Sequence, residues 1–333
     1  MVEMKQMKWL KVSLLMLMAA MLIVTAACGS KGNNKGTGVE EPATAQGNKA
    51  DEGNAVQAGT VYPLKLTDAT GTEVTFEQAP ARIVTLVPSE TELVYAIGGG
   101  EAIVGVDDYS NYPEDAATKT KIGGMEANIE AIVGLKPDLV LASSTMNAPV
   151  IAKLRDLKLN VYASDPKTYD AVIEKVRQIG VIMNQSEKAE EVAKHMQDVR
   201  TEVTEAVKDA PKPKVYLEFS PGYTVGKGEF LDELLTIAGG TNVADQPSWY
   251  QIDPEQVIKS NPDVIIYATM TVKEGEANPI LTEIEKRPGW DTINARKNNQ
   301  MFEVAQDPLV RVGPRLADGL LEVAKKLHPD LVK

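Results

Sequence analysis

Hydrophobic and polar positions alternate with period two near the start of the folded chain. In the stretch "YPLKLTDATGTEVTF", residues 62–76, every second residue of two short runs is apolar. Such alternation around a Gly-containing turn is typical of a β-hairpin. The pattern predicts that Leu64 and Leu66 lie opposite Val74 and Phe76.

The pattern then changes to strands and helices in turn. "RIVTLVPSETELVYAIGG", residues 82–99, predicts a buried strand at 83–87 and then a helix. Ser89 and Glu92 have the spacing of a capping box, so we expect Ser89 to cap this helix. The strands predicted next are 103–106, 138–142 and 160–163. Strand and helix alternation of this kind indicates an α/β fold with a largely parallel sheet.

One segment has helical periodicity without any strand signal. Between Ser186 and Ala210, apolar residues recur at steps of three and four. This predicts a single amphipathic helix of about 35 Å at 1.5 Å per residue. A second series of strands and helices follows, and its first strand is predicted at 215–219.

Two pairs of segments repeat at identical internal spacing. "ELVYAIGG", residues 92–99, matches "ELLTIAGG", residues 233–240, and residues 129–142 match residues 254–267. A period above 100 residues indicates two similar lobes and not a short solenoid repeat. We therefore expect an N-terminal lobe at 61–185, an interlobe helix at 186–210 and a C-terminal lobe at 211–333.

The N-terminal segment has the pattern of a targeting signal. Three lysines precede an apolar run from Val12 to Ala27, which predicts a secretory signal peptide at residues 1–27. The tetrapeptide Thr25 to Cys28 resembles a bacterial lipobox, so we expect Cys28, the only cysteine, to be lipidated. The alternative is a secreted protein with an incidental cysteine. Residues 28–60 are nearly free of apolar side chains, which predicts a disordered tether.

The charge of the chain excludes some partners. The net charge is −12, and loss of residues 1–27 removes three Lys and one Glu, so it becomes −14. An acidic protein is a poor ligand for nucleic acid or for anionic lipid. We therefore expect no nucleic-acid partner, and membrane attachment only through the N-terminal lipid.

Motifs of catalysis are absent from the sequence. The run from Gly222 to Phe230 has neither the spacing nor the Ser or Thr of a Walker loop, so we interpret it as a turn. His195 and His328 are the only histidines, too few for a typical transition-metal site, and we expect both at the surface. No carboxylate pair has a spacing that indicates acid–base catalysis. The sequence predicts a protein that is not an enzyme.

Seven motifs, taken in order, resemble the helix-backbone solute-binding proteins of ABC importers for cobalamin, ferric siderophores and haem. They are "RIVTLVPSETELVYAIG", "VGVDDYSNYP", "GLKPDLVLAS", "AGGTNVA", "PEQVIKSNPDVII", "RPGW" and "VGPRLADGL". The resemblance implies a ligand cleft between two α/β lobes. It also implies an ABC permease dimer with ATPase subunits as partner, and a location on the extracellular face of the cell membrane.

The resemblance implies that glutamates on both lobes dock onto the permease. Glu130 and Glu255 occupy equivalent positions in the internal repeat, so they are the candidates. The alternative is that each acid only stabilises the N-terminus of its helix.

Loops at the carboxyl ends of the strands are expected to bind the ligand. The candidate ligand-binding residues are Ser89, Tyr109, Tyr112, Tyr223, Trp249, Tyr250, Asp307 and Arg311. A core position remains the alternative for Tyr112 and Tyr223, and Trp290 is expected to have a packing role.

The chain is expected to have no intrinsic cofactor and to bind a cobalt corrinoid or a ferric chelate as its ligand. By resemblance, Tyr109, Trp249, Asp307 and Arg311 match corrin-contacting positions, so a corrinoid is favoured. A ferric siderophore or haem is the alternative. A ligand-sensing lipoprotein and a polysaccharide-cleaving enzyme are two other classes, and the second requires closely spaced cleft carboxylates.

Overall fold

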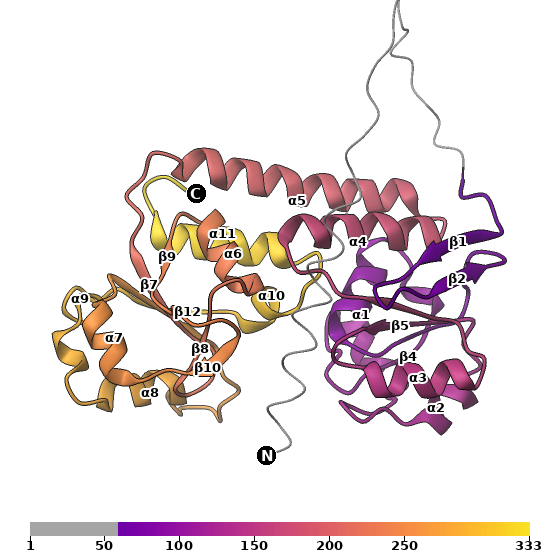
Figure 1. Cartoon of the computed structure of the whole chain (residues 1–333), viewed down its shortest axis with the longest axis horizontal. Coiled ribbons are helices and arrows are strands. Elements are labelled where there is room, and N and C mark those ends of the chain that lie inside the picture. The colour runs from indigo at the N-terminus through magenta and orange to yellow at the C-terminus, as the bar shows by residue number, and fades with distance from the viewer. Residues whose placement is uncertain (1–58) are drawn as a thin grey trace, which may run out of the picture. The chain divides into compact units, whose positions relative to one another are not determined.

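The structure, a computed structural model, describes residues 59–333 (Figure 1). The predicted signal peptide, Cys28 and the predicted tether up to residue 58 lie outside the described residues. Thr60 is already attached to the N-terminal lobe, because its backbone N–H donates to Asn184 Oδ1 at 2.8 Å. No helix within residues 59–333 is both long and apolar enough to cross a bilayer.

The N-terminal lobe is built on a four-stranded parallel sheet in the order β4-β3-β5-β6. An antiparallel hairpin of β1 and β2 lies beside it, and Leu64 faces Phe76 while Leu66 faces Val74, as the alternation predicts. The strands of this lobe are β1 (Leu64–Thr67), β2 (Glu73–Phe76), β3 (Ile83–Thr85), β4 (Ile103–Val106), β5 (Leu139–Ser143) and β6 (Val161–Ser164).

Helices connect these strands. They are α1 (Pro88–Ala96), α2 (Ile129–Gly134), α3 (Ala148–Asp156) and α4 (Tyr169–Ile182), with two 3₁₀ turns, η1 (Gly100–Ala102) and η2 (Glu114–Thr118).

The predicted capping box at the start of α1 is wrong. The helix begins at Pro88, its N-cap residue is Val87, and no side chain caps it. Proline has no N–H to satisfy and a φ angle that suits the first helical position, so the helix starts one residue before Ser89. Ser89 is therefore inside the first turn, and Glu92 is free to pair with arginines of the other lobe.

The C-terminal lobe repeats this design with a parallel sheet in the order β12-β11-β7-β9. A separate antiparallel ribbon pairs β8 with β10. The strands are β7 (Lys214–Glu218), β8 (Tyr223–Val225), β9 (Thr241–Asn242), β10 (Trp249–Gln251), β11 (Val264–Ala268) and β12 (Met301–Val304). The helices are α6 (Phe230–Ile237), α7 (Pro254–Ser260), α8 (Pro279–Lys286), η3 (Trp290–Thr292), α9 (Asn294–Lys297), α10 (Gln306–Val310) and α11 (Leu316–Leu327).

The internal sequence repeat extends to single backbone angles. Gly98 and Gly239, equivalent in the first pair of segments, have φ angles of +83° and +82°. Lys136 and Asn261, equivalent in the second pair, have φ angles of +49° and +47°. Left-handed residues at matching positions end matching helices, so the two lobes share local geometry as well as sequence.

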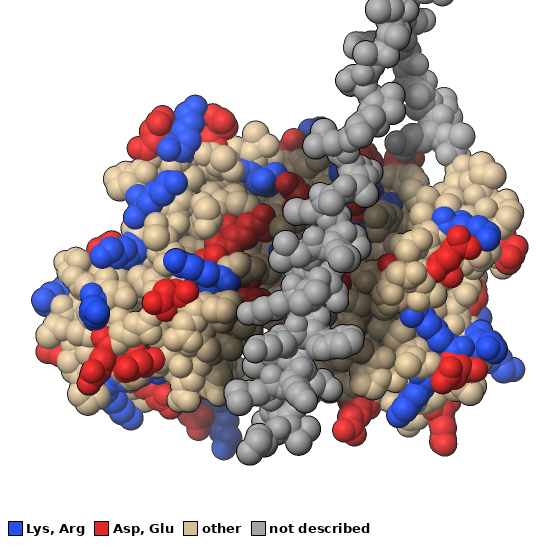
Figure 2. All heavy atoms as spheres, in the orientation of Figure 1, with Lys and Arg blue, Asp and Glu red and all other residues tan. Residues whose placement is uncertain are grey.

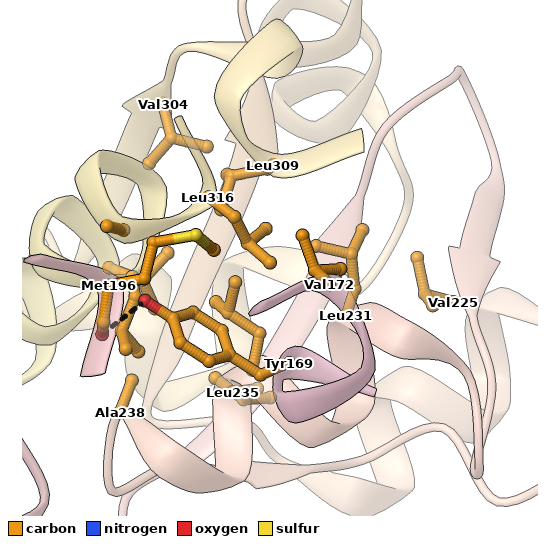
Figure 3. Packing of buried hydrophobic residues seen from close by; sticks show 14 of the residues in the cluster. Tyr169, Val172, Met196, Val225, Leu231, Leu235, Ala238, Val304, Leu309 and Leu316 are labelled. Atoms are coloured by element: carbon orange, nitrogen blue, oxygen red, sulfur yellow. Dashed lines mark hydrogen bonds between the residues drawn. The ribbon is translucent and has the colours of Figure 1, made fainter. Parts of the chain in front are cut away.

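A long helix, α5 (Ser186–Val207), runs along both lobes (Figure 1). Its 22 residues span about 33 Å. Beneath it, one continuous hydrophobic core includes residues of both lobes. Figure 3 shows part of this core, where the Tyr169 hydroxyl of α4 donates to the Met196 carbonyl of α5 at 3.0 Å and Leu231 and Leu235 of α6 lie close by. The two lobes therefore share a core and cannot separate without exposing it.

Two expectations about side chains outside the cleft have different outcomes. Trp290 is fully buried and packs edge-on against Tyr216, with ring centroids 5.5 Å apart, which confirms its packing role. The expectation of a surface position is wrong for His328, which is only 7% exposed and lies against the carbonyl of Gly239. Helix α11 ends next to α6, so the turn after it is covered by the neighbouring helix.

Candidate functional site

A cavity of about 380 Å³ lies between the two lobes at the carboxyl ends of both parallel sheets. The N-terminal lobe contributes the first turn of α1 and the loops after β5 and β6. The C-terminal lobe contributes the start of α6, strand β10 and the segment around α10. Open α/β sheets bind ligands at this edge, so the cavity is the candidate ligand site.

Two of the predicted ligand-binding residues, Ser89 and Trp249, line this cavity. Trp249 is 43% exposed. Its ring makes a T-shaped contact with the ring of Phe219, with ring centroids 6.2 Å apart and planes at 90°. Ser248, directly before it, has a φ angle of +66°. A left-handed serine is uncommon and costs of order 1 kcal/mol or more, so the chain turns sharply where it presents Trp249.

The β8–β10 ribbon determines to which side Trp249 and Tyr250 point. Trp249 lies opposite Val225, and Tyr250 lies opposite Thr224. Because successive strand residues point to opposite faces, Trp249 and Tyr250 cannot both face the cavity. Tyr250 packs against the hydrophobic core, and its hydroxyl is buried with no hydrogen-bond partner among residues 59–333.

Close backbone contact holds this ribbon to the loop before β10. The N–H of Gly226 donates to the carbonyl of Ser248 at 2.8 Å, and the N–H of Lys227 donates to Gln246 at 2.8 Å. A Cβ atom at Gly226 would overlap both carbonyl oxygens. Only glycine fits there, which fixes the loop that ends in Trp249.

Tyr223 and Tyr112 are 45% and 48% exposed, so the alternative core position is wrong for both. Tyr223 lies on β8, opposite Gln251. Tyr112 lies in a second groove of about 500 Å³, with Tyr95 and His195. The guanidinium carbon of Arg315 lies 4.1 Å from the centre of the Tyr112 ring, a cation–π contact. The structure therefore places Tyr112 apart from the cavity that contains Trp249.

Arg311 and Asp307 form part of an ionic junction between the lobes. Glu92 of α1 accepts from Arg311 at 2.7 Å, and it accepts from Arg315 Nε and Nη2 at 2.8 and 2.6 Å. Arg311 also pairs with Asp307 at 2.8 Å. Burial opposes the charge of Arg315, but the Glu92 carboxylate outweighs it and raises the pKa of the guanidinium above its ordinary value. The predicted Asp307 and Arg311 pair thus exists, and Glu92 is a third member that the sequence did not indicate.

Tyr109 is 62% exposed, next to this junction, and its carbonyl accepts from Arg311 at 3.3 Å. Asp107 shapes the loop, because it accepts from the backbone N–H of Tyr109 at 2.8 Å and from the hydroxyl of Ser110. Burial raises the pKa of Asp107 above its ordinary value despite these two donors. The loop is therefore fixed by a buried carboxyl group, while the Tyr109 ring faces solvent.

A buried ion pair that the sequence did not reveal includes one residue of the cavity wall. Glu90 also lines the cavity and is 1% exposed, and its Oε1 accepts from Lys175 at 3.0 Å and from Ser164 at 2.6 Å. Lys175 also donates to the carbonyl of Val312 at 2.9 Å, so it joins the two lobes. Within "SETE", Glu90 resembles an ordinary acid of a first helical turn. Only the fold shows that it faces inward.

Residues 59–333 contain no group of three or more His, Cys, Asp or Glu side chains arranged so that they could hold a metal ion. The face drawn in Figure 2 has acidic and basic side chains interspersed over both lobes. The uncovered part of residues 59–333 in this view shows no broad basic surface of the kind that binds nucleic acid.

Comparisons with known proteins agree with this architecture. The family model described as "Periplasmic binding protein" matches residues 83–308. YvrC of Bacillus subtilis, an uncharacterised ABC transporter substrate-binding lipoprotein, is 36% identical over 300 residues, which are 86% of this chain and 93% of YvrC. The vitamin B12-binding protein of Vibrio cholerae is 31% identical over 255 residues, which are 74% of this chain and 88% of that protein.

A possible iron-binding, periplasmic solute-binding protein from Staphylococcus epidermidis has a similar structure. The TM-score is 0.63 at 30% identity, and the match covers 75% of this chain and 100% of that protein. These relatives are described as binding proteins and not as enzymes. The chain therefore belongs to the periplasmic binding protein family.

Proposed function

We propose that the chain is the extracellular solute-binding component of an ABC importer and that it captures a corrinoid in the cavity between its lobes. The observation that carries this proposal is the cavity itself, with Trp249 half exposed in its wall. The exposed indole ring offers apolar area to a large macrocyclic ligand, and polar side chains of the cavity can fix its orientation. A relative at 31% identity is described as a vitamin B12-binding protein, which supports the same ligand class.

A ferric chelate is the second candidate ligand. The protein from Staphylococcus epidermidis described as possibly iron-binding supports it at 30% identity. Against it, Arg311, the cationic side chain expected for an anionic chelate, is paired with Glu92 and Asp307. A chelate would have to compete with both carboxylates for this arginine.

Titration of the purified, lipid-free protein with cyanocobalamin, a ferric siderophore and haemin separates these ligands. We expect saturable quenching of tryptophan fluorescence with cyanocobalamin. The signal should come from Trp249, because Trp290 is fully buried outside the cavity. Saturation by the siderophore or by haemin, with none by cyanocobalamin, would replace the corrinoid by that ligand.

We propose that Glu130 and Glu255 dock onto the two membrane subunits of the permease. Both side chains are exposed, and neither forms an ion pair or side-chain hydrogen bond with any other residue from 59 to 333. They lie in the first turns of α2 and α7, whose N-caps, Asn128 and Asp253, both accept a backbone hydrogen bond through their side chains. Each glutamate is thus the second residue of a capped helix, and equivalent positions on the two lobes would suit a partner with two-fold symmetry.

We propose that Cys28 carries the lipid that keeps the protein at the extracellular face of the membrane. A Cys28→Ser chain should be recovered mainly from the culture medium, whereas the unchanged chain should sediment with membranes. Immunoblots of the two fractions measure this. Equal retention of both chains by the membrane would show that another element anchors the protein.

A further inference from the structure

One carboxylate oxygen in the cavity wall has no partner within residues 59–333. Glu90 Oε1 accepts from Lys175 and Ser164, but Glu90 Oε2 is buried and accepts no hydrogen bond. A buried acceptor that leaves water without a new donor costs of order 1–3 kcal/mol, and more when it is charged. Such an atom in a native fold requires an explanation, and a position in a ligand cavity supplies one.

The neighbours of Glu90 show that its charge is already balanced. Lys175 is 4% exposed and lies 3.0 Å from Oε1, so one positive charge compensates the carboxylate. A second cation is therefore not needed at Oε2. What Oε2 lacks is a hydrogen-bond donor, and a neutral N–H or O–H group would suffice.

The cavity side of Glu90 is the side from which a ligand can supply that donor. Ser89 and Ser164 also line the cavity, and Ser164 is committed to Oε1. We propose that Glu90 Oε2 accepts a hydrogen bond from an amide or hydroxyl group of the captured solute. This inference rests on the proposed function, since it assigns one recognition atom within the same cavity.

The assignment has a consequence for selectivity. An amide N–H at the rim of a chelate would satisfy Oε2, whereas a carboxylate at the same place would repel it at close range in a poorly solvated site. Sites built to form a buried hydrogen bond discriminate strongly against analogues that leave it unmade. The cavity therefore selects corrinoids whose peripheral groups are amides over corrinoids whose peripheral groups are acids.

The test compares two probes, dicyanocobinamide with peripheral amides and dicyanocobyrinic acid with peripheral carboxylates. The chain with Glu90 should prefer the amide probe by at least about tenfold in Kd. Glu90→Gln can keep its carbonyl oxygen towards Lys175 and Ser164, which turns its NH₂ group to the place of Oε2. A donor then replaces the acceptor, so we expect the amide-to-acid preference to fall at least tenfold or to invert.

Two further variants keep the result interpretable. Glu187→Gln removes one exposed carboxylate from α5, which contributes no residue to the cavity. It should change the preference less than threefold. Because Glu90→Gln alone leaves Lys175 charged and buried without its partner, Glu90→Gln/Lys175→Met is measured as well, with thermal unfolding of every variant.

The outcomes separate this inference from the proposed function. An unchanged preference in Glu90→Gln and in the double variant, or an equal change in Glu187→Gln, would overturn the role of Oε2 while leaving corrinoid capture intact. If the unchanged chain binds neither corrinoid probe, corrinoid capture fails. In that case a siderophore that binds through amide or hydroxyl groups must lose at least tenfold in affinity in Glu90→Gln, and capture of haemin, whose peripheral groups are carboxylates, would overturn the inference. Binding of none of these chelates would overturn both.

Discussion

Reversal of charge at Glu130 and Glu255 together should abolish solute uptake while leaving solute affinity unchanged. Both carboxylates are exposed at the starts of α2 and α7, away from α5 (Figure 1). If they pair with cations of the permease, Glu130→Lys/Glu255→Lys puts like charges together on both lobes, which costs several kcal/mol across an interface. Uptake of labelled solute by cells should fall more than tenfold, and each single reversal should have a smaller effect.

The matched control is Glu187→Lys/Glu202→Lys. It makes the same change in net charge at two exposed positions of α5. This variant should transport at nearly the unchanged rate, because α5 lies on another side of the molecule. If both double variants lose uptake equally, net charge and not docking explains the effect. If Glu130→Lys/Glu255→Lys loses solute affinity, the two glutamates act on the ligand site and the docking proposal fails.

Trp249→Ala should remove most of the affinity for the solute. The ring is 43% exposed in the cavity wall, so a ligand can cover roughly 100 Å² of it. At about 25 cal/mol per Å², this burial contributes about 2–3 kcal/mol, or roughly a 30- to 150-fold change in Kd. Isothermal titration calorimetry measures the loss without depending on the fluorescence that the substitution removes.

Two comparison variants accompany this measurement. Trp249→Phe keeps an aromatic face and should recover part of the affinity. Tyr112→Ala removes an aromatic side chain of similar exposure that lies in the second groove, so it should change Kd by less than about threefold. Equal losses at Trp249 and Tyr112 would mean that the ligand extends over both grooves, and unchanged affinity in Trp249→Ala would remove the ring from the site.

Local pattern was sufficient to predict the α/β architecture and the repeat. Strand β4 has the predicted bounds, and α5 begins at the predicted residue. Both depend on periodicity and on residues adjacent in sequence, which a single chain displays directly. The equivalent turns at Gly98 and Gly239 were visible for the same reason, because both lobes use the same local chemistry.

Side-chain partners from distant segments could not be predicted in this way. Glu92 was interpreted as half of a capping box, yet its partners Arg311 and Arg315 lie more than 200 residues away. The pairing of β8 with β10, which turns Trp249 to the cavity and Tyr250 to the core, likewise requires the register between two strands that α6 and β9 separate in the sequence. Glu90 was overlooked because its burial depends on α4 and on the segment around Val312.

The hydrophobic core that continues from one lobe into the other also affects how a bound solute can be released. Tyr169, Met196 and Leu231 would all meet water if the lobes were drawn far apart, and burial of such side chains is worth about 25 cal/mol per Å². Wide spontaneous opening of the lobes therefore carries a large cost in free energy. In the proposed importer, the timing of release passes from the binding protein to the membrane complex, which must loosen the solute's contacts at the mouth of the cavity.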